Sequence, residues 1–374
     1  MSVKRYVDFV VGVPLVQLLG LLSRRSVPTG EIKKVLIIKL AAVGDTVLLN
    51  HALSNFRKVH SDIELHWLVS PINQTIARLC ADVDRFFVWP GGVATLPALV
   101  NTLRRERYDV VFDLEQWSRG TALLSYFSGA PVRIGFDTPG QHRAALFTDS
   151  YLKKFDQHEI DDFYAVLSQS GTLPRDHALS LKIPSESSAA LEAAGLSRFV
   201  GSKKLKVLIH PGCGADGLPR EWPLPSYGVL AHWLLKNKNA ELVLTSGPEE
   251  TAKAAQLNRL LSGAALNMGG RLSWTDLIAL VSKVDLVISG NTGIMHIAAA
   301  LSKKQVALHG PTNPLLWGPL NSKAVIVASS CPKCPCLKLG FEYHAADQSC
   351  MAFIDVETVK QAVSTALGDS QTKL

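Results

Sequence analysis

Three short turns carry the residues whose types and spacing could do chemistry. Each turn follows an apolar run and opens a helical pattern, so each is predicted to lie at the carboxyl end of a strand. Open α/β sheets bind their ligands at that edge. The first turn contains Gly44 and Asp45, after the β-branched run 34–40. A carboxylate there is either a helix N-cap or a general base, and the residues alone leave both interpretations open.

The second turn, within residues 208–223, combines glycines with a cation. Gly212 is followed by two more glycines, which leave the backbone open to a ligand, and Arg220 supplies a fixed positive charge suited to phosphate. The next strand-like run leads into Glu249 and Glu250. Acidic residues are ordinary in the first turn of a helix, but a carboxylate at a strand end can also hold the hydroxyls of a ribose.

The third turn, within residues 287–301, reads Gly-Asn-Thr-Gly before a helix of small residues. The amides of a first helical turn, with the helix dipole behind them, form a site for a diphosphate. His296 lies one turn further and could hydrogen-bond the same anion. The alternative is a buried helix capped by Asn291 or Thr292, whose alanines allow close packing on the sheet.

Two familiar motifs are missing from the chain, and a third lacks its context. Residues 212–217 read Gly-x-Gly-x-x-Gly, but no helix pattern opens directly after them as in a dinucleotide fold, which disfavours an NAD-dependent enzyme. The phosphate-binding loop of P-loop NTPases and the Gly-x-Ser-x-Gly elbow of α/β-hydrolases are also absent.

Chain length and net charge further restrict the number of domains and the classes of partner. The 374 residues are too many for one ordinary core and comfortable for two domains. The net charge of +7 suits anionic partners such as phosphorylated small molecules or an acidic membrane surface. Nucleic acid is the weakest candidate, because no run of Lys and Arg is interleaved with aromatic residues.

The elements that must position these turns alternate between strand and helix patterns. Strands are predicted at 34–40, 63–69, 85–89, 109–114 and 132–136, and again at 206–212, 240–247, 285–290 and 305–310. Helices are predicted at 93–108, 225–237, 274–284 and 356–367. The alternation, interrupted once by a polar stretch, predicts two Rossmann-like, doubly wound α/β domains that face one another across a cleft.

The predicted organisation has five parts. They are an apolar and basic segment at 1–30, a first α/β domain at 31–173, a linker at 174–204, a second α/β domain at 205–330, and a cysteine-rich segment with a C-terminal helix at 331–374.

The N-terminal segment is apolar from Phe9 to Leu22, shorter than the roughly 20 residues of a spanning helix. Its basic flanks are Lys4, Arg5, Arg24 and Arg25. We interpret it as a helix lying on a membrane surface, with a helix packed on the protein itself as the alternative. A convincing signal-peptide cleavage site is lacking.

Four cysteines gather near the C-terminus: Cys331, Cys334, Cys336 and Cys350. They could hold a structural zinc ion in a tetrahedral site, and His344 is a possible substitute ligand. Because the spacing is not that of a standard zinc finger, reduced thiols without metal remain the alternative.

Four segments follow one another in a specific order and spacing. They are KLAAVGDTVLLNHALSNFRKVHSDIELHWLV, IHPGCGADGLPREWP, TSGPEE and SGNTGIMHIAAALSKKQVALHGPTNP. Together they resemble the family 9 glycosyltransferases, whose best-known members are the ADP-heptose:lipopolysaccharide heptosyltransferases. The resemblance implies a GT-B fold and an inverting transfer of sugar from a nucleotide diphosphate sugar, with no metal and no other cofactor required.

The resemblance implies that the domain at 31–173 binds the acceptor and that the domain at 205–330 binds the nucleotide sugar. It also implies roles for individual residues. Asp45, preceded by Gly44, matches the family's candidate base, and Arg220 matches a donor-phosphate residue. Further donor-phosphate positions are Thr292, Gly293, Ile294, Met295 and His296. Donor-nucleotide positions are Gly212, Glu250 and Asn291, with Glu249 as an alternative for the ribose. Asn291 departs from the family, which usually has Asp there, and this puts the identity of the sugar in doubt.

The implied partners are ADP-heptose or a similar donor, a lipid-linked saccharide acceptor such as lipopolysaccharide core, and the membrane surface. The expected location is the cytoplasmic side of the inner membrane, as a peripheral protein. Two other classes stay open: a GT-B sugar-nucleotide epimerase or hydrolase, and a nucleotide-sugar-binding protein without catalytic activity.

Overall fold

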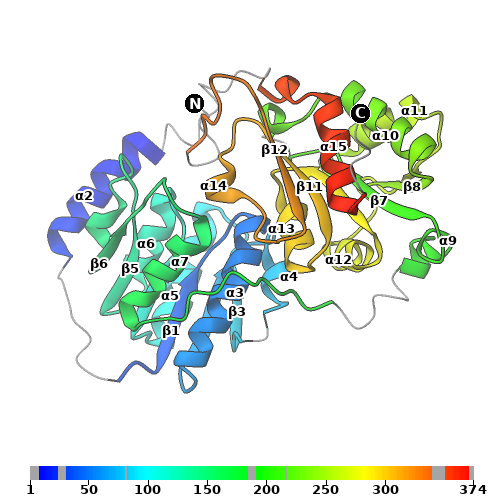
Figure 1. Cartoon of the computed structure of the whole chain (residues 1–374). Coiled ribbons are helices and arrows are strands. Elements are labelled where there is room, and N and C mark those ends of the chain that lie inside the picture. Colours follow the sequence, from blue (N-terminus) through cyan, green and yellow to red (C-terminus); the bar gives the residue numbers. More distant parts are fainter. Residues whose placement is uncertain are drawn as a thin grey trace. The chain divides into compact units, whose positions relative to one another are not determined.

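The computed structural model describes residues 8–23, 31–80, 82–183, 191–214, 217–338 and 350–369. The chain divides into two compact units, Met1–Asp176 and His177–Leu374, which run from blue to green and from green to red in Figure 1. Each unit is built on its own six-stranded parallel sheet. The predicted domain boundaries remain predictions.

The first sheet has the strand order β3-β2-β1-β4-β5-β6. Its strands are β1 (Lys34–Ile38), β2 (Glu64–Val69), β3 (Arg85–Val88), β4 (Val110–Asp113), β5 (Val132–Asp137) and β6 (Asp149–Leu152). The helices of this unit are α2 (Val13–Leu22), α3 (Val43–Val59), α4 (Gln74–Ala77), α5 (Leu96–Glu106), α6 (Arg119–Phe127) and α7 (Glu159–Leu167). Short non-α turns are η1 (Asp8–Gly12), η2 (Val93–Thr95), η3 (Arg143–Leu146) and η4 (Ser168–Ser170).

Helices cover both faces of this sheet, and alternating strand residues show which helix lies where. Val111 of β4 belongs to the core that Leu103 of α5 and Leu124 of α6 complete. The next residue, Phe112, contacts the ring of Phe56 on α3 at 5.9 Å, on the opposite face. Because both faces are covered, the inner strands are mostly apolar, and their polar residues His66, Asp113 and Arg133 are buried.

The second sheet has the order β12-β11-β10-β7-β8-β9. Its strands are β7 (Leu205–His210), β8 (Ala240–Leu244), β9 (Leu266–Asn267), β10 (Leu286–Gly290), β11 (Lys304–His309) and β12 (Ala324–Ala328). The helices are α9 (Ser197–Val200), α10 (Leu224–Asn237), α11 (Thr251–Leu260), α12 (Trp274–Lys283), α13 (Gly293–Ala300), α14 (Pro314–Trp317) and α15 (Val356–Leu367). Its short turns are η5 (Leu218–Arg220), η6 (Pro248–Glu250) and η7 (Cys350–Phe353).

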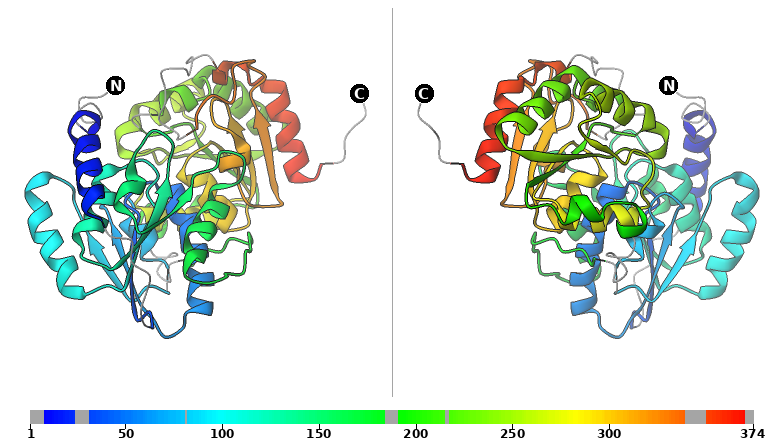
Figure 2. Two further views of the ribbon diagram at one scale, coloured as in Figure 1. Left: turned by 90° about the vertical axis from the view of Figure 1, so that its left-hand side faces the viewer. Right: turned by 90° about the vertical axis from the view of Figure 1, so that its right-hand side faces the viewer.

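Helices α10, α11 and α15 share one core with this sheet, and Figure 2 shows α15 (red) beside β11 and β12 (orange). The small-residue helix α13 is almost wholly buried and packs against β10, β11 and α12. Counted from its own first strand, each sheet has the order 3-2-1-4-5-6. This is the doubly wound arrangement in which ligands bind outside the carboxyl ends of the strands. The predicted pair of doubly wound α/β domains is confirmed.

Three strands were not predicted, namely β6, β9 and β12. All three lie at sheet edges. β9 has only two residues and β6 (DSYL) has no apolar run, whereas β12 (AVIVA) has one and was missed all the same.

The N-terminal helix α2 docks on the first unit by one side. Val16 is fully buried against Leu146 and Phe147, and Gly20 lies so close to Ala145 that a larger side chain would collide with it. Ser23 then accepts a hydrogen bond of 2.9 Å from the guanidinium of Arg133. The helix is therefore held at a fixed rotation about its own axis.

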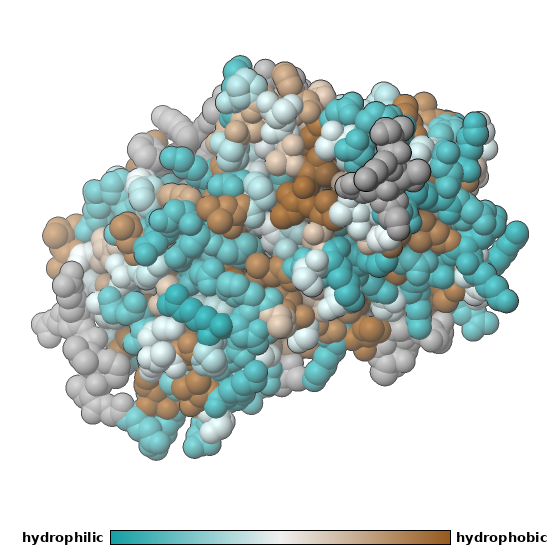
Figure 3. Space-filling view, in the orientation of Figure 1, coloured by the Kyte–Doolittle hydropathy of each residue, from teal (hydrophilic) through white to brown (hydrophobic). Residues whose placement is uncertain are grey.

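The other side of η1 and α2 exposes apolar residues. They are Val10, Val11, Leu15, Leu18, Leu21 and Leu22. Figure 3 shows hydrophobic residues (brown) at the left-hand edge of the molecule, where α2 lies in Figure 1. The basic residues predicted to flank this helix, Lys4, Arg5, Arg24 and Arg25, lie outside the described residues. Among the helices that the structure describes, none is both long and apolar enough to cross a membrane.

Replacing Val16 with alanine tests the docking of α2. Because Val16 is fully buried, Val16→Ala should lower the free energy of unfolding by about 1–3 kcal/mol through lost burial and a cavity. Leu18, which is 61% exposed on the same helix, provides the control, and Leu18→Ala should leave stability nearly unchanged. Urea unfolding of both variants measures the difference, and equal losses would contradict this account of α2.

Candidate active site

Asp45 lies at the carboxyl edge of the first sheet, in the first turn of α3. The N-cap of α3 is Ala42, so Asp45 is the third helical residue and the N-cap interpretation of Asp45 is wrong. Its carboxylate is 2.9 Å from the ammonium of Lys39, and its side chain is 21% exposed. The ammonium of Lys39 thus orients the carboxylate of Asp45, which remains partly exposed to solvent.

Lys39 is the buried centre of this edge. Burial by itself would lower the pKa of Lys39, but the carboxylates of Asp45, Glu115 and Glu159 outweigh it and raise that pKa, so the side chain is an ammonium at neutral pH. Glu115 is 3.6 Å from Lys39 and also accepts hydrogen bonds from the amides of Leu40, at 2.7 Å, and Ala41, at 3.0 Å. One carboxylate therefore fixes both the lysine and the turn that leads into α3.

A second buried ammonium extends the cluster. Lys153, just after β6, is 2.6 Å from Glu159 and 2.5 Å from Asp162, both on α7. Burial raises the pKa of Glu159 to about 7, and the negative charge of Asp45 acts in the same direction. Gln116 donates a hydrogen bond to the same carboxyl group. The edge that carries Asp45 is therefore a network of charges rather than a single acid.

Sequence reasoning missed most of this network. Lys39 directly follows the buried residues Val35–Ile38 of β1, and a charged residue at that position was a usable signal, because a buried lysine needs a partner. Glu115 and Glu159 gave no local signal, since they reach Lys39 only when β4 and α7 come together in the fold.

On the second sheet, Arg220 bridges two of the predicted turns. Its guanidinium donates to the carbonyl of Cys213 at 3.1 Å and to that of Asn291 at 3.4 Å. Its Nε is buried and has no hydrogen-bond partner among the described residues. A buried donor without a partner is costly, so this nitrogen is suited to bind an anionic ligand.

Glu250 holds the glycine turn after β7. Its carboxylate accepts a hydrogen bond of 3.1 Å from the amide of Cys213 and pairs with Lys253 at 2.9 Å. Gly212 is packed against that carboxylate so closely that a Cβ would collide with it. These contacts show that Gly212 and Glu250 have a structural role in the turn. That they also contact the nucleotide remains a prediction.

The third turn contributes amides and a buried hydroxyl. Thr292 is the N-cap of α13, but its side chain makes no capping hydrogen bond, and its hydroxyl has no partner within the described part of the chain. The amide of Met295 already donates to the carbonyl of Thr292 at 3.1 Å, which leaves the earlier amides, including those of Gly293 and Ile294, for an anion. Thr292 therefore occupies the N-cap position of a buried helix, as the alternative interpretation predicted, but its side chain makes no capping hydrogen bond. His296 is buried within α13.

The cysteine cluster is a possible metal site. The sulfur atoms of Cys331, Cys334 and Cys350 all lie within 4.8 Å of one another. His344, the substitute ligand considered from the sequence, lies outside the described residues.

A second group that could hold a metal consists of Glu64, His66 and Glu106. Lys34 already pairs with Glu106 at 2.5 Å and with Glu64 at 3.2 Å, and Arg85 pairs with Glu106 at 2.7 Å. Because two cations already neutralise these carboxylates, this group is a poor metal site.

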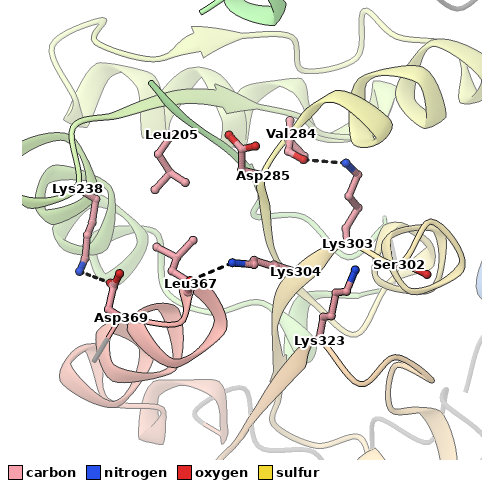
Figure 4. Close-up of a pocket in the computed structure, with 10 residues that line it drawn as sticks. All are labelled: Leu205, Lys238, Val284, Asp285, Ser302, Lys303, Lys304, Lys323, Leu367 and Asp369. Carbon is pink, nitrogen blue, oxygen red and sulfur yellow. Dashed lines mark hydrogen bonds and ion pairs between the residues drawn. The ribbon is translucent and has the colours of Figure 1, made fainter. Parts of the chain in front are cut away.

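A wide pocket at the opposite edge of the second sheet is a weaker candidate for chemistry. It has a volume of about 620 Å³ and lies at the amino ends of β7, β10 and β11. Figure 4 shows that three of its four lysines are engaged within the protein: Lys238 pairs with Asp369, Lys303 donates to the carbonyl of Val284, and Lys304 donates to that of Leu367. The polar groups of the candidate site lie instead at the carboxyl edges.

Comparison with known proteins identifies the family. The model of glycosyltransferase family 9 (heptosyltransferase) matches residues 97–345, two thirds of the chain. The chain belongs to glycosyltransferase family 9. This family 9 protein is 23% identical over 308 residues to the lipopolysaccharide core heptosyltransferase OpsX of Haemophilus influenzae, a match that spans 79% of this chain and 84% of the relative.

Solved structures of other family 9 enzymes have the same fold. Escherichia coli ADP-heptose lipopolysaccharide heptosyltransferase II superposes with a TM-score of 0.73 at 20% identity, covering 89% of this chain and 98% of the other. Escherichia coli heptosyltransferase WaaC with ADP gives 0.66 at 19% identity, covering 89% and 99%. The protein is therefore a glycosyltransferase of the GT-B fold.

The raised pKa of Glu159 predicts how stability depends on pH. The folded state keeps a proton on Glu159 up to about pH 7, whereas the unfolded chain loses it near the ordinary pKa of 4.5. The stability that protonated Glu159 contributes is complete below pH 4.5 and is lost as the pH rises through about 7. Glu159→Gln mimics the protonated form at every pH. The Tm of this variant minus the Tm of the wild type should therefore increase by a few degrees between about pH 5 and about pH 8.

Thermal unfolding of both proteins across this pH range measures the difference, in which contributions from other residues cancel. Glu31, exposed on the same unit, supplies the control variant Glu31→Gln, whose Tm should follow that of the wild type. A Tm difference between Glu159→Gln and wild type that stays constant with pH would show that Glu159 is ionised throughout.

Proposed function

We propose that this glycosyltransferase moves a heptose from ADP-heptose to a lipopolysaccharide core or a similar lipid-linked saccharide, with inversion at the anomeric carbon. The observation that carries the proposal is Asp45, a partly exposed carboxylate held by a buried ammonium at the ligand-binding edge of a doubly wound sheet. Relatives named as heptosyltransferases support the sugar, and solved WaaC structures with ADP and with ADP-2-deoxy-2-fluoro heptose support the donor.

The proposed reaction is a single displacement. The acceptor hydroxyl oxygen attacks the anomeric carbon of the donor, while Asp45 takes the hydroxyl proton. The bond between that carbon and the diphosphate oxygen breaks, and its electron pair leaves with ADP. Lys39 keeps the carboxylate of Asp45 oriented toward the reacting oxygen.

The leaving diphosphate needs positive charge and hydrogen-bond donors, and the second unit offers both. We assign Arg220 to this role because its buried Nε lacks a partner among the described residues. The early amides of α13 and the hydroxyl of Thr292 would donate to the same anion, with the helix dipole behind them. We propose that Glu250 and Asn291 contact the nucleotide of the donor. With these donors, transfer is proposed to need no metal, and zinc at the cysteines, where bound, would be structural.

The proposed location is the cytoplasmic face of the inner membrane. The outward side of α2 presents a stripe of apolar residues, and the chain carries a net charge of +7, which together suit a bilayer rich in anionic lipids. Such a surface would bring the enzyme to an acceptor that is itself anchored in lipid.

Asp45→Asn tests the proposed base, because it keeps the shape of the side chain and removes its ability to take a proton. The turnover number should fall about 10²- to 10⁴-fold with little change in donor affinity. Asp276 occupies the same third helical position in α12, so Asp276→Asn is a matched control that should keep full turnover. ADP release from a panel of sugar nucleotides, with extracted lipid A-core as acceptor, measures both variants.

Three outcomes would contradict the proposal. Release of nucleotide without acceptor would indicate the epimerase or hydrolase class. Donor binding without turnover on any lipid-linked acceptor would indicate a binding protein. Full turnover in Asp45→Asn would remove Asp45 as the base.

Vesicle binding tests the membrane surface of α2. Leu18 and Leu21 are 61% and 85% exposed, so Leu18→Asp/Leu21→Asp should abolish co-sedimentation with vesicles that contain phosphatidylglycerol. Val93 is 82% exposed on the same unit but outside α2, and Val93→Asp should bind like the wild type. Equal loss of binding in both variants would count against a specific role of α2.

A further inference from the structure

The wide pocket at the amino ends of β7, β10 and β11 carries positive charge that its carboxylates do not neutralise. The charged residues that line it are Lys238, Lys303, Lys304, Lys323, Asp285 and Asp369. Each aspartate already faces another lysine: Asp369 is 2.6 Å from Lys238, and Asp285 is 3.6 Å from Lys206. The three remaining lysines of the lining have no carboxylate partner in the part of the chain that the structure describes.

Neutral groups hold two of these three ammonium groups in place. Lys303 donates to the carbonyl of Ser282 at 2.6 Å and to that of Val284 at 3.0 Å. Lys304 donates to the carbonyl of Leu367 at 2.9 Å. A carbonyl removes no charge, and an ammonium group has three N–H donors, so both lysines keep their charge and at least one donor for a ligand.

The ends of two helices account for part of this arrangement. Ser282 lies in the last turn of α12 and Leu367 is the last residue of α15, and lysines commonly bind the free carbonyls at helix C-termini. This explanation does not cover Lys323, which is exposed and whose ammonium makes no hydrogen bond or ion pair among the described residues. It also gives no reason for the cavity between the lysines.

The lysines repel one another. Burial lowers the pKa of Lys303. Three neighbouring lysines lower it further, namely Lys283, Lys323 and Lys206. The carboxylate of Asp285 acts in the opposite direction without restoring the ordinary pKa. An anion between these groups would relieve the repulsion, whereas a metal ion would increase it.

The wall of the pocket that faces the lysines is apolar. Figure 4 shows Leu205 and Leu367 on one side of the pocket and Lys303 and Lys323 on the other, with Lys304 reaching between them. The volume of about 620 Å³ is within the range of pockets that hold small organic ligands. A charged side and an apolar side together suit a ligand that has phosphate at one end and an apolar body at the other.

We propose that this pocket binds an anion that carries phosphate on a partly apolar body, the chemistry shared by a free nucleotide and a phospholipid headgroup. Lys303, Lys304 and Lys323 bind the phosphate oxygens, for which ammonium groups act as compact point charges. The leucines contact the apolar part.

This site is separate from the proposed donor site. β11 begins at Lys304 and ends at His309, so the pocket is about 17 Å from the carboxyl edge of the sheet. A ligand of this size at one edge does not reach the other. Binding in the pocket therefore does not depend on the proposed transfer reaction.

ADP is the probe for a free nucleotide. Because ADP should also bind the proposed donor site, equilibrium dialysis uses full-length Arg220→Ala, in which that site is weakened. Adding Lys323→Glu should weaken the remaining binding about tenfold, since it removes a charged hydrogen bond and introduces a repulsive charge. Lys236, an exposed lysine of α10 outside the pocket, supplies the matched control, and Lys236→Glu should leave this binding unchanged.

Acetylation of lysines in the wild-type protein is a second measurement, and it needs no variant. ADP should protect Lys304 and Lys323 from acetylation and leave Lys236 equally reactive, as measured by mass spectrometry of the digested protein.

Vesicles that contain phosphatidylglycerol are the probe for a lipid headgroup. Leu18→Asp/Leu21→Asp removes the proposed contribution of α2, so any co-sedimentation that remains reports on other surfaces. If the natural ligand is a lipid, adding Lys323→Glu should abolish this remaining co-sedimentation, and adding Lys236→Glu should not.

The two probes distinguish the sources, and either positive result supports the site. Protection and binding by ADP indicate a free nucleotide, whereas vesicle binding that depends on Lys323, without an effect of ADP, indicates a lipid. Absence of both, or equal losses in Lys323→Glu and Lys236→Glu, would overturn the site. Because none of these readouts uses turnover, they remain decisive if the proposed function is wrong.

Discussion

The pairing of buried Lys39 with surrounding carboxylates is the interaction on which the first unit depends. A lysine at the end of an inner parallel strand is tolerated only if negative charges surround it, and the fold supplies them from α3, from the loop after β4 and from α7. The same arrangement leaves one carboxylate, that of Asp45, partly exposed to solvent. The cluster that neutralises Lys39 therefore also holds the proposed base. A change in any member of the cluster should affect both the stability of the first unit and the position of Asp45.

The second unit has the same strand order, but its candidate site is formed by turns rather than by a buried charge cluster. Its glycine turn after β7 and the turn after β10 are held together by Arg220, while Glu250 braces the first turn from behind. Most of these contacts involve backbone atoms. A site built from backbone groups suits the diphosphate of a nucleotide sugar, because amides and a fixed guanidinium provide directed donors without a metal.

The sequence predicted what depends on local pattern. Inner strands such as β1 and β10 were found because both faces are buried, and the resemblance to family 9 followed from short segments in a fixed order. The edge strands β6 and β9 escaped because they lack that pattern, whereas β12 has it and was missed. The partners of Lys39 escaped for another reason: Glu115 and Glu159 lie far from it in the chain, and only the packed sheet and α7 bring their charges to it. The contact of Glu250 with the amide of Cys213 is likewise a product of tertiary structure.

The docking of α2 has a consequence for how an acceptor is found. Val16, Gly20 and Ser23 fix the rotation of this helix on the first unit, so its outward apolar stripe faces one direction only. On the proposed membrane surface, the first unit would therefore meet the bilayer in few orientations. For an acceptor confined to that surface, the search would become lateral diffusion in two dimensions with a preset approach angle, rather than tumbling in three.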